Sequence, residues 1–435
     1  MPENERFDVQ CINDEILEAL SLDNRYNFVN NNLMSILEQD QFKFLREVER
    51  FCKRYEKNND ITHGPEEDIY DWIDDFGDEG YISRAHDYSE VVDEEITKPY
   101  GMMADFLRYL AIDLFDTQFA MGSGATVLAT NPLYEHHDDV PVRKEALRDM
   151  LTGESAGAIL ITEPERGSDA THMTTLCEEQ DDGSFILNGT KIYNTNAPKA
   201  DWVVAYATAE KNNSNKMGQF LIDTSWDGFK VERVGIPWVP KLYLGKEELT
   251  DLRVPSEYVL GGIGKGKAHL FEGLVPERLG IAMGAVSQCW GSISIASIYA
   301  NMREQMGKEI LKWQGVGFLL GDFWAKTTNM TLALIKFAES YDEKVEKFGG
   351  EDKIPGAVRQ AMVASASQLK YQTTLLSKEL CYEMGNLMGG AGVCDNTAMH
   401  DYMNISRIQE VIGGTRQIQQ YIMSMSLRTL FKMSV

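Results

Sequence analysis

Two stretches of the chain place apolar residues at helical spacing, and a stretch with the pattern of strands separates them. The first helical stretch runs from Leu37 to about Met150, where apolar residues recur three or four positions apart, as at Phe44, Val48 and Phe51. That spacing is typical of one face of an α-helix. The residues before Leu37 are rich in Asn, Asp and Glu. We interpret them as an N-terminal extension, and a mobile acidic tail explains the same composition equally well.

The middle stretch, from about Gly153 to Gly262, has the pattern of short β-strands. Its apolar residues fall in alternating or β-branched runs at 158–161, 184–187, 202–206 and 219–222. Asp182-Gly183 and Asn188-Gly189 tolerate the positive φ of tight hairpin turns, so each predicts a turn between strands. Short strands at close spacing predict a small β-sandwich or β-barrel, which ends near the glycine-rich segment 261–266.

The helical period returns from Pro276 onward in three long runs, 279–302, 315–348 and 358–388. Small residues such as Gly280 and Gly284 allow helices to pack closely there. The pattern therefore predicts an α+β protein with an N-terminal extension (1–36), an N-terminal helical domain (37–152), a central β-barrel or β-sandwich domain (153–268) and a C-terminal helical domain (269–435).

Composition and charge exclude several classes of protein. The chain has 435 residues and a formal net charge of −25, which repels the phosphates of nucleic acids and of anionic membranes. The N-terminus lacks the basic start and apolar run of a signal peptide, and no segment reads as a membrane span. We therefore expect a cytoplasmic protein with no nucleic-acid partner and no membrane insertion. Its six cysteines are scattered and are expected to be reduced and mostly buried.

Several familiar reaction motifs are missing from the sequence. There is no GxGxxG after a strand, no GxxxxGK[ST], no HExxH and no GxSxG. The segment His136–Asp139 is the one metal-like cluster, but adjacent side chains point in different directions, so a solvated loop is favoured. No metal site is expected.

Five segments in a fixed order carry the informative signal: Thr162–Asp169, Asn188–Asn196, Pro276–Leu279, Gly389–Gly392 and Gly413–Gln419. From about Leu37 to the C-terminus, the sequence resembles the acyl-CoA dehydrogenase family. The resemblance implies that family's fold, in which a helical domain, a β domain and a four-helix-bundle-like domain follow one another. It also implies an enzyme that removes two hydrogens from the Cα and Cβ of an acyl-CoA thioester.

The resemblance further implies FAD as cofactor, an electron-transfer flavoprotein as electron acceptor and a homotetramer. Arg303 and Gln314 match positions that reach the FAD of a neighbouring subunit, where a guanidinium suits a pyrophosphate. By matching position, the expected FAD contacts are Leu160, Ile161, Thr162, Ser168, Tyr193, Thr195, Arg303, Met306, Gln314, Asn386, Gly389, Gly390, Thr415 and Gln417. The expected substrate contacts are Ser168, Arg278 and Gly413.

The catalytic base is where this chain departs from many relatives. The family's glutamate often precedes the Gly-Thr of the last motif, but that position is Gly413 here, which has no side chain to take a proton. Another branch of the family places the acid just before the arginine of the long helix, and here Glu277 precedes Arg278. Glu277 is therefore the expected base. The alternative is that Glu277 only complements the dipole of a helix that begins beside it.

Other acids and other functions stay open. Asp113, Asp116 and Glu410 are carboxylates that could approach the site, although solvated or structural roles explain each of them better. A branched, cyclic or long acyl group is weakly favoured. Two alternatives remain: a flavin-dependent monooxygenase or oxidase of the same fold, and a non-catalytic interaction protein that retains the fold.

Overall fold

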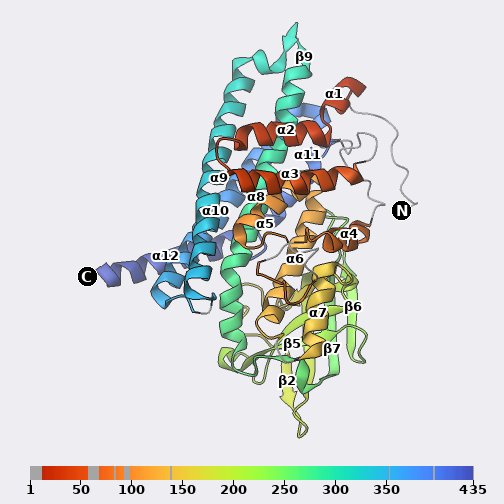
Figure 1. The fold of residues 1–435 in the computed structure, drawn as a ribbon, viewed down its shortest axis with the longest axis vertical. Coiled ribbons are helices and arrows are strands. Elements are labelled where there is room, and N and C mark those ends of the chain that lie inside the picture. Colours follow the sequence, from red (N-terminus) through yellow and green to blue (C-terminus); the bar gives the residue numbers. More distant parts are fainter. Residues whose placement is uncertain are drawn as a thin grey trace.

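The structure, a computed structural model of the chain, describes residues 12–56, 68–82, 85–92, 98–137, 140–351, 353–394 and 397–434. Helices form one end of the molecule and strands the other (Figure 1). The order helix, strand, helix confirms the predicted fold class. The helices of the N-terminal part are α1 (Asp14–Ala19), α2 (Leu22–Leu33), α3 (Gln39–Cys52), α4 (Ile73–Asp78), α5 (Met102–Phe115), α6 (Thr117–Tyr134) and α7 (Pro141–Thr152).

The N-terminal helices pack as one layer with the long helices of the C-terminal part. Leu22, Tyr26 and Val29 of α2 lie in the same hydrophobic core as Leu45 and Val48 of α3. The described part of the predicted extension is therefore packed helix rather than a mobile tail, and residues 1–11 lie outside the described residues. The hydrophobic core continues across Leu37. The predicted domain boundaries remain predictions.

The middle of the chain forms an eight-stranded mixed sheet within the described residues. The strand order is β6-β7-β3-β2-β4-β5-β8, and β1 pairs with β4 in parallel. Leu187, Val203, Phe220 and Leu252 from four of these strands share one buried core. The strands are β1 (Ala158–Leu160), β2 (Leu176–Glu179), β3 (Phe185–Thr195), β4 (Trp202–Thr208), β5 (Met217–Asp223), β6 (Phe229–Val234), β7 (Leu244–Val254) and β8 (Val259–Leu260).

One of the two predicted hairpin turns is wrong. Asp182-Gly183 does join β2 to β3, and the Gly183 N–H donates to the Gln180 carbonyl. Asn188-Gly189 instead lies inside β3, where the register against β7 shifts between Leu187 and Gly189. A Cβ at Gly189 would come within 2.7 Å of Thr175 Cα. The glycine is therefore needed for a bulge and a close backbone approach, not for a turn.

Two of the C-terminal helices, α8 and α9, run lengthwise beside each other to a short β9–β10 hairpin at the top of Figure 1, and α12 projects to the left. Helix α8 is long and apolar enough to cross a membrane by length and composition, but 83% of its most apolar window is buried inside the protein. The elements are α8 (Gly266–Met302), β9 (Glu304–Gln305), β10 (Lys308–Glu309), α9 (Gln314–Phe348), α10 (Gly356–Met388), α11 (Met399–Gln409) and α12 (Arg416–Ser434).

The cysteines only partly match the expectation. Cys52, Cys177, Cys289 and Cys381 are free and buried, as predicted. Cys394 is disulfide-bonded, contrary to the prediction. Spacing along the sequence does not reveal which cysteines approach each other in space, and a disulfide depends on that approach.

Substitution of Gly291 tests the packing of α8 against α11. A Cβ at this position would come within 2.3 Å of the ring of Tyr402, which is buried and whose hydroxyl donates to the Asp113 backbone carbonyl at 3.2 Å. We expect Gly291→Ala to lower the free energy of unfolding by about 1–3 kcal/mol, because the ring has no free space to move into.

The measurement is urea unfolding followed by circular dichroism. Gly321→Ala is the matched control, because Gly321 lies in α9 and a Cβ there meets nothing within 4 Å. The control should be neutral or slightly stabilising, since alanine favours helix by about 1 kcal/mol over glycine. Equal effects of the two substitutions would contradict the prediction.

Candidate active site

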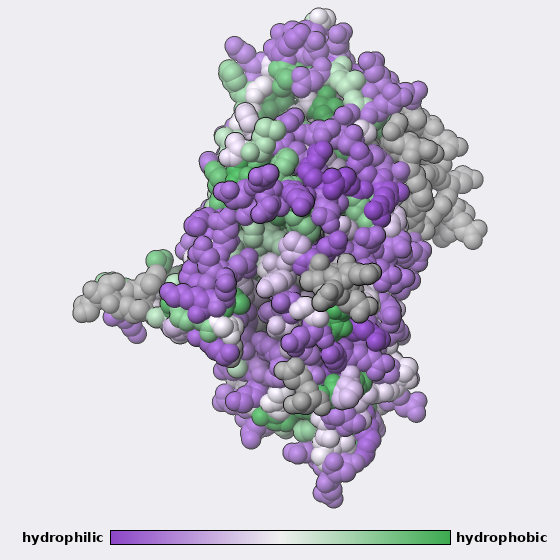
Figure 2. Space-filling model, viewed as in Figure 1, coloured by the Kyte–Doolittle hydropathy of each residue, from purple (hydrophilic) through white to green (hydrophobic). Residues whose placement is uncertain are grey.

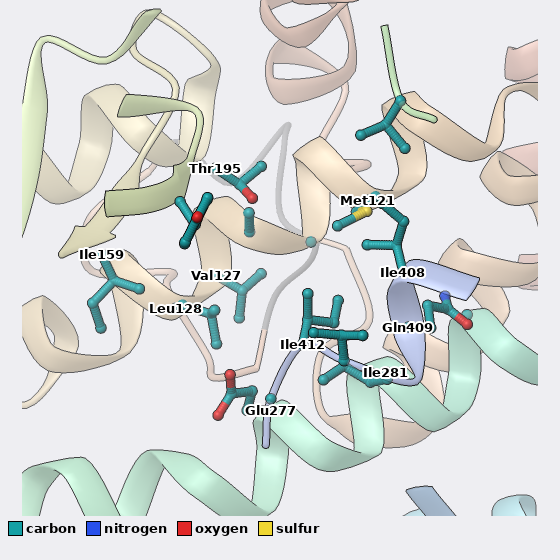
Figure 3. A pocket seen from close by; sticks show the side chains of 18 of the residues that line it. Met121, Val127, Leu128, Ile159, Thr195, Glu277, Ile281, Ile408, Gln409 and Ile412 are labelled. Carbon is teal, nitrogen blue, oxygen red and sulfur yellow. The ribbon is translucent and has the colours of Figure 1, made fainter. Parts of the chain in front are cut away.

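A cavity of about 840 Å³ lies where α5, α6 and α8 meet the edge of the sheet and the turn between α11 and α12. Most of its wall is apolar, and Figure 3 shows Glu277 at one side of it. Because an apolar wall excludes water, a charged group here interacts strongly with its neighbours. The apolar wall includes Met121, Val127, Leu128, Ile159, Ile281, Ile408 and Ile412.

Glu277 lies well inside α8, not at its start. The helix begins at Gly266 and contains Pro276, so Glu277 is about three turns from the N-terminus. The dipole of a helix acts mainly on its first turn. The structure therefore removes the alternative explanation in which Glu277 only complements the helix dipole. Its carboxylate lines the cavity instead.

Gly413 faces Glu277 across a short distance. A Cβ at Gly413 would lie 3.5 Å from Cδ and from Oε1 of Glu277. It would also lie 2.1 Å from Cδ1 of Ile281, and the backbone of Gly413 has φ +60°, which disfavours side chains. The Glu277 carboxyl thus occupies the region that a side chain from position 413 would enter.

The turn that carries Gly413 is held by buried side chains. Lys370 Nζ donates to the Gly414 carbonyl at 2.7 Å, and Gln419 Nε2 donates to the Gly413 carbonyl at 3.0 Å. Burial lowers the pKa of Lys370 to about 8, with Glu277 opposing that shift. Burial raises the pKa of Glu277, while the positive charges of Arg278 and Lys370 oppose the rise. Glu277 is thus a stronger base than an exposed glutamate.

The opposite side of the cavity is built from the sheet edge. Ile161, Thr162, Ser168, Tyr193 and Thr195 all line it. Leu160 does not line it. Because side chains alternate along a strand, Ile159 and Ile161 face the cavity and Leu160 is fully buried in the core of the sheet.

Tyr193 is presented to the cavity by a β-bulge. The pairing of β3 with β7 passes from Ile192 to Asn194 and skips Tyr193. Tyr193 has φ +66° and remains 57% exposed. A bulge re-aims a side chain, and here the exposed ring lies beside Thr195 at the cavity. A positive φ on a tyrosine is a strained conformation, which occurs mainly at functional sites.

Besides Leu160, seven of the expected cofactor residues lie outside this cavity. Arg303 is about 39 Å from Glu277 along α8, at 1.5 Å per residue. Met306 and Gln314 are exposed beside it at the same end of the molecule. Asn386, Gly389 and Gly390 are exposed where α10 ends, and Gln417 is exposed in the first turn of α12. Thr415 lines the cavity. One chain therefore brings together only part of the predicted set.

Of the other predicted substrate and acid residues, some line the cavity and others do not. Arg278 is buried and does not line the cavity. Asp116 caps α6 by accepting from the N–H groups of Gln118 and Phe119, and it pairs with Lys241 at 2.7 Å. Glu410 pairs with Lys378 at 2.8 Å, and cations around it keep its pKa low although burial opposes this. Both acids have structural partners, whereas Asp113 lines the cavity.

Sequence reasoning missed most of the cavity wall. Met121 and Leu128 come from α6, and Tyr109 and Gln409 come from α5 and α11. The available signal was the pair Gly280 and Gly284, which was interpreted as helix packing. Small residues one turn apart on α8 also make room for a cavity.

The predicted absence of a metal site is not settled by the geometry. Ligand atoms of Glu135, His136 and His269 lie within 4.8 Å of one another. His269 Nδ1 is 2.6 Å from Gln219 Oε1, so that nitrogen carries a proton. Asp138 and Asp139 lie outside the described residues.

Comparison with known proteins identifies the class to which this fold and cavity belong. A family model described as the acyl-CoA dehydrogenase middle domain matches residues 158–238, and one described as the acyl-CoA dehydrogenase C-terminal domain matches residues 264–427. Together they cover more than half of the chain. The chain belongs to the acyl-CoA dehydrogenase family and is an oxidoreductase.

Relatives of this chain span most of its length. The short-chain specific acyl-CoA dehydrogenase of Megasphaera elsdenii is 27% identical over 72% of this chain and 80% of its own. The CarC subunit of the caffeyl-CoA reductase–Etf complex of Acetobacterium woodii is 27% identical over 69% of this chain and 76% of its own. A glutaryl-CoA dehydrogenase from Mycobacterium smegmatis in complex with FADH2 has a similar fold, with TM-score 0.77, 19% identity, and coverage of 90% and 95%.

Lys370 tests how the Gly413–Gly414 turn is held. We expect Lys370→Met to lower the free energy of unfolding by about 1–3 kcal/mol, because buried carbonyl groups lose their donor. Urea unfolding measures this. The control Lys336→Met removes an exposed lysine with a weak ion pair and should change stability by no more than about 0.5 kcal/mol. An unchanged midpoint for Lys370→Met would show that the turn holds without the ammonium group.

Proposed function

We propose that the chain is a FAD-dependent acyl-CoA dehydrogenase in which Glu277 is the base. The proximity of the Glu277 carboxyl to Gly413 carries this proposal. It supports a site in which the acid from α8 stands in for the missing side chain at position 413. The product is the α,β-unsaturated enoyl-CoA.

The residues at the sheet edge fit a flavin. Tyr193 offers an exposed aromatic ring, and Thr162, Ser168 and Thr195 offer hydroxyl groups on the side of the cavity across from Glu277. Ile161 adds an apolar contact. When bound, the flavin accepts the hydride that leaves Cβ. FAD is bound by a relative of the same fold, the glutaryl-CoA dehydrogenase in complex with FADH2.

Glu277 performs the proton transfer. Its carboxylate removes a proton from Cα of the thioester, and the electron pair of that C–H bond forms the double bond as the hydride leaves Cβ. The backbone N–H of Gly413 would polarise the thioester carbonyl, because a preorganised donor of this kind stabilises the charge that develops. The apolar wall excludes water from the base. Ser168 contacts the substrate beside the flavin.

A second subunit completes the cofactor site. Arg303, Met306, Gln314, Asn386, Gly389 and Gly390 are exposed and outside the cavity, so they serve the FAD of another subunit, whereas Gln417 lines a second pocket beside Thr415. Large exposed apolar side chains on α9, namely Phe318, Trp324 and Leu332, support burial against other subunits. Figure 2 shows apolar patches over the upper half of the molecule, which contains α9. We propose a homotetramer.

The wider function follows from the same family. An electron-transfer flavoprotein accepts the electrons, as supported by the relative that belongs to a caffeyl-CoA reductase–Etf complex. The substrate is an acyl-CoA with a branched, cyclic or long chain, and the enzyme acts in the cytoplasm.

Replacement of Glu277 tests the base. Glu277→Gln should retain FAD but reduce it with acyl-CoA about 100-fold more slowly or worse, because an amide does not accept the proton. Stopped-flow absorbance of the flavin under anaerobic conditions gives this rate. The control Glu257→Gln changes an exposed glutamate outside the cavity and should leave the rate unchanged. A fully active Glu277→Gln enzyme would remove Glu277 from the mechanism, and flavin that turns over only with oxygen would favour an oxidase.

The pH dependence of flavin reduction tests the environment of Glu277. Its ionised form is the active one, and burial raises its pKa above the ordinary value of 4.5. The rate constant for reduction should therefore rise with pH through that raised pKa and fall at lower pH. Lys370→Met removes a charge that opposes the rise, so it should move the profile to higher pH. A profile that is flat from pH 5 to 8 would contradict the prediction.

A further inference from the structure

Three buried polar side chains meet around Gly284 on α8, away from Glu277. A Cβ at Gly284 would lie 2.5 Å from Gln409 Nε2 and 4.0 Å from Gln288 Nε2. Asp113, on α5, lines the cavity together with Gly284 and Gln409. Within the described part of the chain, Gln409 Oε1 has no hydrogen-bond partner, and Asp113 Oδ2 and Gln288 Nε2 have none beyond the contact that these two side chains make with each other.

Unpaired polar atoms in such a place need an explanation. The three side chains are at most 5% exposed, and each buried polar group without a partner costs about 1–3 kcal/mol. They come from three different helices, α5, α8 and α11, so no single local turn explains them. Two of the three residues face a cavity, where a ligand could supply the missing partners.

Asp113 offers a donor rather than a negative charge. Its Oδ1 accepts from the Thr117 hydroxyl at 2.9 Å. Burial raises the pKa of Asp113 to about 8, although the nearby Thr117 and Gln288 side chains oppose the rise, so its carboxyl group is mostly protonated at neutral pH. Gln409 offers an acceptor, Oε1, from the other wall. A donor on one wall and an acceptor on the other match a group that can both accept and donate, such as a hydroxyl.

The cluster lies at a distance from the reacting carbons. Gly284 is two helical turns beyond Glu277, which is about 10 Å along the axis of α8. Figure 3 shows the apolar side chains of Ile281 and Ile412 between Glu277 and Gln409. An acyl chain that extends from Glu277 toward Gln409 therefore passes apolar side chains before it reaches polar groups.

Charged tails fit this end less well. The guanidinium of Arg108, near this wall, pairs with Asp105 at 2.9 Å, and that of Arg407 pairs with Glu410 at 3.2 Å. Each of these guanidinium groups is already paired with a carboxylate of this chain. A protonated Asp113 also gives an ammonium group no counter-charge.

We propose that Asp113 and Gln409 form a polar subsite for the tail of the acyl group, and that the substrate carries a hydroxyl group on its chain well beyond the reacting carbons. This inference rests on the proposed dehydrogenase function. It names two residues that select the substrate without taking part in the proton or hydride transfer.

A matched pair of thioesters tests the subsite. The hydroxylated thioester 8-hydroxyoctanoyl-CoA should have a kcat/KM at least about tenfold higher than octanoyl-CoA, because a site built to bond a hydroxyl discriminates against the analogue that lacks it. Butyryl-CoA is too short to reach the subsite and serves as a test of dehydrogenation alone. Turnover of butyryl-CoA with no preference for the hydroxylated chain would overturn the inference and leave the proposed function standing.

Substitutions at Gln409 and Asp113 test whether these residues cause the preference for the hydroxylated thioester. Gln409→Leu should abolish the preference for the hydroxylated thioester and improve the kcat/KM for octanoyl-CoA. Asp113→Asn keeps the shape of the side chain and serves as a second, milder variant, with a smaller loss of preference. Gln39→Leu, at an exposed position at the start of α3, is the control and should keep the full preference. A preference that persists in Gln409→Leu would contradict the assignment.

Equilibrium binding gives a readout that does not require turnover. Calorimetry with Glu277→Gln should show that the hydroxylated thioester binds more tightly than octanoyl-CoA, again by about tenfold. If the amino analogue, 8-aminooctanoyl-CoA, binds more tightly than the hydroxylated thioester, the choice of a hydroxyl group is overturned. If none of the thioesters binds, both the subsite and the dehydrogenase proposal fall.

Discussion

The site depends on one constraint, which is that α8 is a single long helix buried on most of its surface. A buried helix has a fixed rotation and register, so the positions that face the cavity repeat at each turn. Glu277, Ile281 and Gly284 are such positions, and they place a carboxylate, an apolar side chain and a glycine that Gln409 packs against in a row. The sheet edge and the turn between α11 and α12 then close the cavity against this row. A change in the register of α8 would move all three groups together.

Burial sets the chemistry of this row. A carboxylate in an apolar cavity is a stronger base, but burial also disfavours its ionised form. The ammonium group of Lys370 partly offsets the effect of burial, because it lowers the pKa of Glu277. It also binds the Gly414 carbonyl. The same ammonium group therefore lowers the pKa of Glu277 and holds the turn that faces Glu277. Gly413 completes the arrangement, since any side chain there would collide with Ile281.

The order of elements could be predicted from the sequence, and Glu277, singled out there, does line the cavity, but the shape of the cavity could not be predicted. Long helical runs have a clear period, and Glu277 precedes Arg278 in a recognisable motif. The start of α8 was placed too late, because Pro276 looks like a helix start although it lies inside the helix. The resemblance to the family places Leu160 at the flavin by matching position, whereas alternation along the strand turns its side chain into the core of the sheet. Gln409 had no motif, since it reaches the cavity only through tertiary packing.

The length of α8 also determines what one chain can complete. Glu277 and Arg303 belong to one rigid helix and lie about 39 Å apart along it, so no bending of loops brings them to the same bound molecule within one chain. Arg303 and Met306 are exposed at the far end, where the large apolar side chains of Phe318 and Trp324 are also exposed. Apolar groups of that size on a surface mark a contact with another protein surface. If the exposed end of one chain is to serve the cavity of another, the assembly follows from the rigidity of the helix that carries Glu277.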